Sequence, residues 1–141
     1  MRAEWLALLT AACWGIGGYF EKKGLQLGNL SPQVGVVVRT AVALIILGVI
    51  AAPQLKQIGT AGAKPLVMMI VGGGVVAGAV GMLCFYAALK GAPLGTVMPI
   101  AFTSPLFGAA LGILLGGESL TWKTAAGGAL TVGGIALLTL K

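Results

Sequence analysis

The sequence predicts an all-α membrane protein with five transmembrane helices in a single domain spanning residues 1–141. Of the 141 residues, 58% are hydrophobic and 9% are charged, whereas a soluble domain has about 25% charged residues. Several apolar runs are long enough to cross a bilayer core of ~30 Å, which requires ~20 helical residues. Runs such as residues 44–52 do not alternate between polar and apolar side chains, as the strands of a membrane barrel do.

The five predicted spans are separated by glycine, proline and capping residues. The N-terminal apolar run continues past Cys13 through WGIGGYF and is too long for a cleaved signal peptide, so we take it as a retained span. Ser31 followed by Pro32 is typical of an N-cap and a first helical residue. The expected spans are residues 4–23, 32–52, 65–89, 94–115 and 122–140.

The basic residues are balanced across the membrane if the five spans alternate in direction. Orientation normally follows an excess of Lys and Arg on the cytoplasmic side, and apart from Arg39 this chain places four on each side. The same polypeptide is therefore expected to insert both ways and to pair with its inverted copy, giving ten helices in the inverted-repeat arrangement of many transporters. The two sets are Arg2, Lys56, Lys64 and Lys123, and Lys22, Lys23, Lys90 and Lys141.

Several classes of function are disfavoured. The net charge of +6 is scattered rather than gathered in a basic run, so we expect headgroup anchoring and no nucleic-acid partner. Cys13 and Cys84 fall within spans and there is no histidine, so neither a disulfide framework nor a Cys/His metal site is predicted. We expect both cysteines to be small core residues. No constellation of nucleophile, base and metal is recognisable, and we expect no enzyme and no cofactor.

A set of motifs resembles one EamA domain of the drug/metabolite transporter superfamily. They are Trp14-Gly15 with Lys22, Ser31-Pro32 followed by Arg39, and residues 86–138, which include Pro105 and Glu118. The resemblance implies a five-helix domain, usually paired in one ten-helix chain of inverted topology, that moves small metabolites or drugs by alternating access. It also implies a partner, either an inverted copy of this chain or a paralogous EamA subunit.

Helical spacing suggests what the first and third spans contribute. Thr10, Trp14, Gly17 or Gly18, and Glu21 share one face of the first span. The small residues beside Trp14 leave room either for a ligand or for a closely packed helix. In the third span, Gly74 and Gly78 begin a helix-packing stripe that continues through Met82, Tyr86 and Lys90. Tyr86 is either an interfacial anchor or a substrate contact.

The fourth span combines a packing stripe with two prolines. Ser104, Gly108, Gly112 and Gly116 form a tandem GxxxG pattern that predicts helix packing. Thr96, Pro99 and Thr103 lie on another face, where we consider the two threonines as substrate contacts. Pro99 and Pro105 predict a kinked or broken helix, which is either static or part of a transport site. We expect Glu118, just before the fifth helix, to be structural.

Arg39 is the one charge inside the second span, about 10 Å from its start at ~1.5 Å per residue. An ion pair with Glu21 would lower the cost of both charges, since the end of the first span and the start of the second lie on the same side. We hypothesise that Lys22 and Arg39 face a polar cavity and bind a carboxylate or phosphate, with Glu21 as counter-ion or proton acceptor. The alternative is a structural ion pair with lysines that snorkel to the headgroups.

The predicted function is secondary transport of a small metabolite or drug-like molecule by an antiparallel homodimer. The alternative is a non-transporting membrane subunit of a heteromeric transporter or flippase. Because no targeting extension is apparent, we expect a multi-pass protein of the inner (plasma) membrane.

Overall fold

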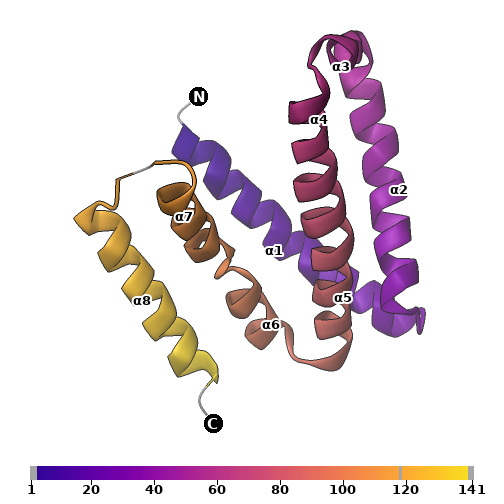
Figure 1. The fold of residues 1–141 in the computed structure, drawn as a ribbon. Coiled ribbons are helices and arrows are strands. Elements are labelled where there is room, and N and C mark those ends of the chain that lie inside the picture. Colours follow the sequence, from indigo (N-terminus) through magenta and orange to yellow (C-terminus); the bar gives the residue numbers. More distant parts are fainter. Residues whose placement is uncertain (1–2, 118, 140–141) are drawn as a thin grey trace. The chain divides into compact units, whose positions relative to one another are not determined.

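The computed structural model describes residues 3–117 and 119–139, which form helices joined by short turns (Figure 1). Glu118 and the ends of the chain lie outside the described residues. The chain divides into two compact units, residues 1–91 and residues 92–141. We describe each unit by itself.

The first unit begins with helix α1 (Ala3–Leu27), which turns sharply into helix α2 (Pro32–Ala51). Asn29 has a φ of +44°, and the amides of Asn29 and Leu30 donate to the carbonyls of Gln26 and Leu25. These two hydrogen bonds are typical of a helix that is terminated by a residue in the left-handed conformation. Ser31 caps α2 by accepting from the amide of Val34, with Pro32 in the first turn, as the sequence predicts.

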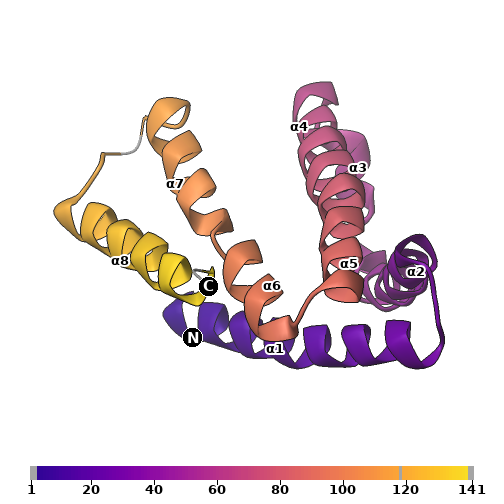
Figure 2. The ribbon, with the colours of Figure 1, turned by 90° about the horizontal axis from the view of Figure 1, so that it is seen from below.

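A helix run returns antiparallel to α2 in the first unit (Figure 1). It follows the short segments η1 (Ala52–Gln54) and α3 (Lys56–Thr60) and comprises α4 (Ala63–Met68), η2 (Met69–Gly81) and α5 (Met82–Gly91). Figure 2 views the first unit down the axis of α2, with α1 inclined to both α2 and α5.

Segment η2 is π-helical over thirteen residues, whereas the sequence predicts one regular α-helix across 65–89. Its hydrogen bonds join residues five apart, and π-helical turns are rare outside functional sites. The consecutive glycines Gly72, Gly73 and Gly74 supply no side chains to hold a regular α-helical surface. Periodicity could not reveal this change, because the segment is apolar or glycine throughout and has no polar face whose repeat could be followed.

The core of the first unit lies where α1, α2 and α5 meet. Leu25, Val36, Tyr86 and Leu89 are buried there. Gly35 allows the close approach, because a Cβ at this position would lie 2.6 Å from Leu25 Cδ2 and 2.8 Å from the Tyr86 ring. A side chain at position 35 is therefore excluded by its neighbours.

Two lysines join the helix ends beside this core. Lys22 donates from Nζ to the carbonyl of Leu89 at 2.7 Å, and Lys90 donates to the carbonyl of Leu30 at 2.9 Å. The Leu89 carbonyl lies in the last turn of α5, where carbonyls lack partners within the helix and lysine side chains satisfy them favourably, and the Leu30 carbonyl lies in the turn between α1 and α2. The end of α1, the start of α2 and the end of α5 are thus held together.

The second unit contains α6 (Leu94–Ala101), α7 (Ser104–Leu114) and α8 (Trp122–Thr139). The span expected over 94–115 is interrupted between α6 and α7, where Pro99 lies inside α6 and Pro105 in the first turn of α7. The hydroxyl of Thr103 donates to the carbonyl of Ile100 at 2.7 Å. This bond satisfies a carbonyl next to the break, consistent with the kink that the prolines predict.

The glycine stripe of the fourth span does not remain helical to its end. Gly108 and Gly112 lie within α7, but α7 ends at Leu114 and Gly116 belongs to the following turn. Gly117 has a φ of +68°, which glycine adopts without strain. Within this unit the close approach occurs instead at Gly128 of α8, where a Cβ would lie 3.1 Å from Leu106 Cδ2.

Three helical stretches of the described chain are long and apolar enough to cross a membrane: Pro32–Gln54, Ala63–Gly91 and Leu94–Leu114. They correspond to the second, third and fourth expected spans, and the first and fifth spans stay predictions. One expectation is wrong: Cys13 and Cys84 are exposed on the chain rather than packed in its core. A free cysteine behaves as a small apolar residue, so it is compatible with an exposed position on an apolar helix.

Candidate functional site

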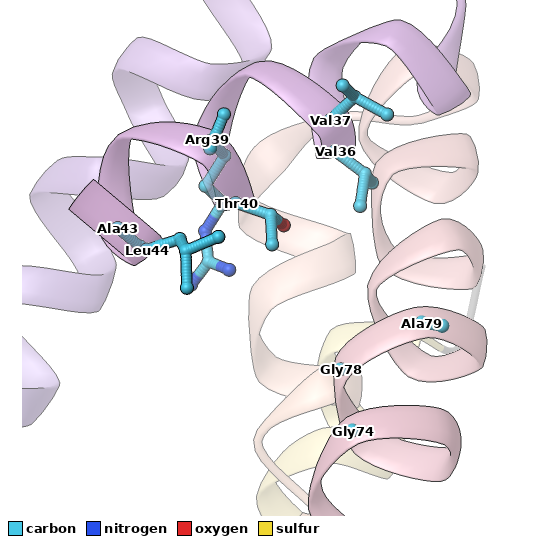
Figure 3. Close-up of a pocket in the computed structure, with 10 residues that line it drawn as sticks. Val36, Val37, Arg39, Thr40, Ala43, Leu44, Gly74, Gly78 and Ala79 are labelled. Atoms are coloured by element: carbon cyan, nitrogen blue, oxygen red, sulfur yellow. The ribbon is translucent and has the colours of Figure 1, made fainter. Parts of the chain in front are cut away.

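An open groove of about 540 Å³ lies between α2 and the π-helical segment η2 (Figure 3). Ligand pockets commonly have volumes of ~300–1,000 Å³. The α2 wall bears Arg39 and Thr40 among apolar side chains, and the η2 wall is formed by small residues, so it is smooth. The lining residues are Val36, Val37, Arg39, Thr40, Ala41, Ala43, Leu44, Gly74, Gly78 and Ala79.

The charge in this groove is held by the ion pair expected from the sequence. Arg39 Nε lies 2.9 Å from Glu21 Oε1, joining α2 to α1. The Arg39 side chain is 38% exposed and that of Glu21 is 21% exposed, so the guanidinium is paired but still reachable from the groove. Pairing of this kind is what makes a charge tolerable within an apolar segment.

Tyr86 of α5 lies beside the ion pair that joins α1 and α2. Its side chain is 2% exposed and packs on Gly35, and its hydroxyl interacts with the Glu21 carboxylate. The sequence leaves Tyr86 as either an interfacial anchor or a substrate contact, and in this structure the side chain is buried within the first unit. Because its ring is fixed in the core, the Tyr86 hydroxyl is held in one place near Glu21.

The fold directs Lys22 away from the groove that Arg39 lines. It follows Glu21 directly in α1, yet its Nζ donates to the carbonyl of Leu89 and Lys22 does not line the groove. Among the described residues of the first unit, Arg39 is the cation that lines the groove, whereas one of the two hypotheses from the sequence placed Arg39 and Lys22 together in a cavity.

The remaining candidate residues lie elsewhere. Trp14 is exposed on α1 and does not line the groove. Thr96 and Thr103 belong to the second unit, together with Pro99, Pro105, Gly108, Gly112 and Gly116. Gly74 and Gly78 line the groove, and their role in packing helices stays a prediction. A Cβ at Gly74 would meet no atom within 4 Å, so no described helix packs on it.

Most of the residues that line the groove were not anticipated from the sequence, Thr40 and Ala43 among them, and neither was Gly35, which packs against Tyr86. A helical projection centred on Arg39 would have found Ala43, because residues four positions apart lie on the same face of a helix; Thr40, one position further along, lies on a different face. Nothing local marks Gly35, because its role depends on Leu25 and Tyr86, which lie far from it in the chain.

The groove carries the kinds of groups that bind and orient a ligand. It offers apolar surface, one guanidinium and one hydroxyl, which are elements of orientation and specificity. Among residues 3–117 and 119–139, no group of three or more His, Cys, Asp or Glu side chains could hold a metal ion.

Comparison with known families identifies the class of protein. A family model described as the EamA-like transporter family matches residues 1–140. The chain therefore belongs to the EamA-like transporter family, and the family and its apolar helices make it a multi-pass membrane protein. Searches among curated proteins and among solved structures find no match.

Proposed function

We propose that this chain is a secondary transporter of a small metabolite or drug-like molecule that works by alternating access as an antiparallel homodimer. The family match over residues 1–140 carries the proposal. The balanced Lys and Arg residues support insertion in both orientations, and pairing of inverted copies would generate the inverted repeat typical of transporters.

The helix lengths agree with five spans in each copy. Helix α1 has 25 residues and α8 has 18 described residues, so at ~1.5 Å per residue both come close to the ~30 Å of a bilayer core. The broken helix α6–α7 and the π-helical η2 supply irregular backbone within apolar stretches. Such backbone at membrane depth is tolerated where it is buried or lines a cavity.

The groove supports a role for a second copy. It is open, and the η2 wall at Gly74 has space for further atoms. In the proposed dimer, the inverted copy covers this face and converts the groove into an enclosed path. Substrate and coupling contacts are assigned to Arg39 and Glu21 first, with Trp14, Thr96 and Thr103 as contributors from other helices and Lys22 and Tyr86 as positioning residues.

The experiment is a two-site topology assay. Single cysteines are placed at Gln57, exposed on α3, and at Gln26, exposed near the end of α1, in a Cys13→Ala/Cys84→Ala background. Intact cells are labelled with an impermeant thiol reagent before and after opening. We expect about half of the copies to react at each site, as balanced charge predicts.

A single orientation would overturn the antiparallel homodimer. In that case one site labels fully and the other not at all, and the search turns to a paralogous EamA partner or to a role as a non-transporting subunit. If both sites label equally, the purified protein is reconstituted and tested for counterflow of amino acids, sugars, nucleosides and aromatic acids. Protein that forms the dimer but moves none of them would refute the transport assignment.

A further inference from the structure

We propose that the groove between α2 and η2 binds a water-soluble organic monocarboxylate with an apolar body, and that Glu21 takes up one proton when this anion binds Arg39. This inference rests on the proposed transport function, for which it names the substrate class. It is carried by the composition of the groove walls and by the geometry of the Glu21–Arg39 pair.

The guanidinium is not saturated by Glu21. Arginine has five N–H donors in a fixed fork, and the contact with Glu21 is made through Nε. Within the described part of the chain, the ion pair with Glu21 is the one polar contact of the Arg39 side chain. Donors therefore remain for a second acceptor, and the planar fork matches a carboxylate.

The rest of the groove favours an apolar ligand body. Apart from Arg39 and Thr40, its walls are made of valine, alanine, leucine and glycine. Figure 3 shows Val36, Thr40 and Leu44 projecting from α2 toward the space bounded by Gly74, Gly78 and Ala79. A carboxylate at Arg39 and Thr40 would leave an attached hydrocarbon or aromatic body against the smooth η2 wall, where removal from water is favourable.

The charge balance selects a single carboxylate and couples it to a proton. Glu21 and Arg39 together are neutral, so an added monoanion leaves the site with one net negative charge in surroundings of low dielectric. That state is costly, and protonation of Glu21 restores neutrality. The proton comes from water and resides on the Glu21 carboxyl group, and both ligand and proton leave together. A dicarboxylate would need a second proton or a second cation.

The groups around Glu21 are consistent with this exchange. Arg39 faces it from α2 and Tyr86 from α5. Lys22 and Lys90 are bonded to backbone carbonyls, and Lys23 lies beside Tyr19. A carboxylate bound at the remaining Arg39 donors would bring a second negative charge close to Glu21, and a nearby like charge favours the protonated form of a carboxyl group.

The experiment measures equilibrium binding of 2-naphthoate to the full chain in nanodiscs of zwitterionic lipid, with empty nanodiscs as the blank for partition. The neutral 2-naphthamide and the cationic 2-naphthylmethylamine are the matched probes. We expect saturable binding of naphthoate alone, and at least an about tenfold loss in Arg39→Gln, since a charge-assisted hydrogen bond is removed. Lys23→Gln, which removes the same charge outside the groove, should bind normally.

Two further variants keep the test independent of the ion pair's role in folding. A Cβ meets nothing within 4 Å at either Gly74 or Gly73, but only Gly74 lines the groove. Gly74→Leu should abolish naphthoate binding and Gly73→Leu should not. In wild type the affinity should rise as pH is lowered over a range where the probe stays ionised, and Glu21→Gln should bind without this pH dependence.

The proposal fails on any of three results: no preference for naphthoate over naphthamide, equal effects of the Gly74 and Gly73 variants, or displacement of naphthoate by added phosphatidylglycerol, which would assign Arg39 to a lipid headgroup. Binding and transport are separable. Naphthoate binding without counterflow of any tested compound refutes the transport function and keeps the site. Counterflow of other compounds without naphthoate binding refutes the site and keeps the function.

Discussion

The packing of Tyr86 on Gly35 permits a sharp test of how the ion pair is positioned. Replacing Gly35 by alanine adds one methyl group, which would lie 2.6 Å from Leu25 Cδ2 and 2.8 Å from two carbons of the Tyr86 ring. Leu25 and Tyr86 are both almost fully buried, so neither can rotate away into open space. The methyl group must displace a helix or the ring.

The expected cost follows from overpacking. Adding a methylene-sized group to a well-packed core costs ~1–3 kcal/mol. The same change at Gly48 of α2 is the matched control, because a Cβ there meets nothing within 4 Å. Alanine exceeds glycine in helix propensity by up to ~1 kcal/mol, so Gly48→Ala should be neutral or stabilising. The two substitutions in α2 should therefore differ in effect: Gly35→Ala lowers the free energy of unfolding, and Gly48→Ala does not.

The assay is SDS-induced unfolding in mixed micelles, followed by circular dichroism. We expect Gly35→Ala to lower the free energy of unfolding by ~1–3 kcal/mol and Gly48→Ala not to lower it. Combining Gly35→Ala with Leu25→Ala removes one of the clashing groups, so the double variant should lose less than the sum of the single losses. Additive losses, or a Gly35→Ala protein as stable as wild type, would refute the close packing at this position.

Three other predictions follow from single contacts. In a double-mutant cycle of SDS unfolding, Glu21→Gln and Arg39→Gln should show a favourable coupling of about 0.5–3 kcal/mol. A coupling of zero would mean that the 2.9 Å ion pair does not persist in the membrane. Lys90→Met removes the hydrogen bond to the Leu30 carbonyl and should lower the free energy of unfolding by ~1 kcal/mol in the same assay. The control Lys23→Met should lower it less, and equal losses would contradict the contact between Lys90 and Leu30. Thr103→Val loses the 2.7 Å hydrogen bond to the Ile100 carbonyl and should lower the free energy of unfolding by ~0.5–1.5 kcal/mol. The control is Thr60→Val, which loses a hydroxyl bond to Gln57 in the short helix α3 and should lower it less. The opposite order would contradict a supporting role of Thr103 at the helix break.

The ion pair illustrates how far the sequence reaches. Arg39 and Glu21 could be paired in advance because a turn of a few residues joins their helices, and a lone charge in an apolar run requires a partner. The Ser31 cap and the interruption near Pro105 were predictable for a similar reason, since both depend on local backbone chemistry. The family, too, could be recognised from motifs along the chain.

Contacts between distant segments were decided by the tertiary structure. The sequence left Tyr86 as an interfacial anchor or a substrate contact, and Lys22 as a cavity cation or a snorkelling lysine. The packing of α5 against α1 and α2 buries the tyrosine and directs the lysine to the Leu89 carbonyl. The groove wall likewise depends on the π-helical form of η2 and its position opposite Arg39.

The sequence by itself determined the membrane class, the helix boundaries set by caps and prolines, and the family, because these depend on composition and on residues within a few turns of one another. Only the tertiary structure decided which cation lines the groove, what holds its carboxylate, and why position 35 must be glycine. Those properties arise from side chains that are distant in the chain, and their distances are set by how the helices of the first unit pack.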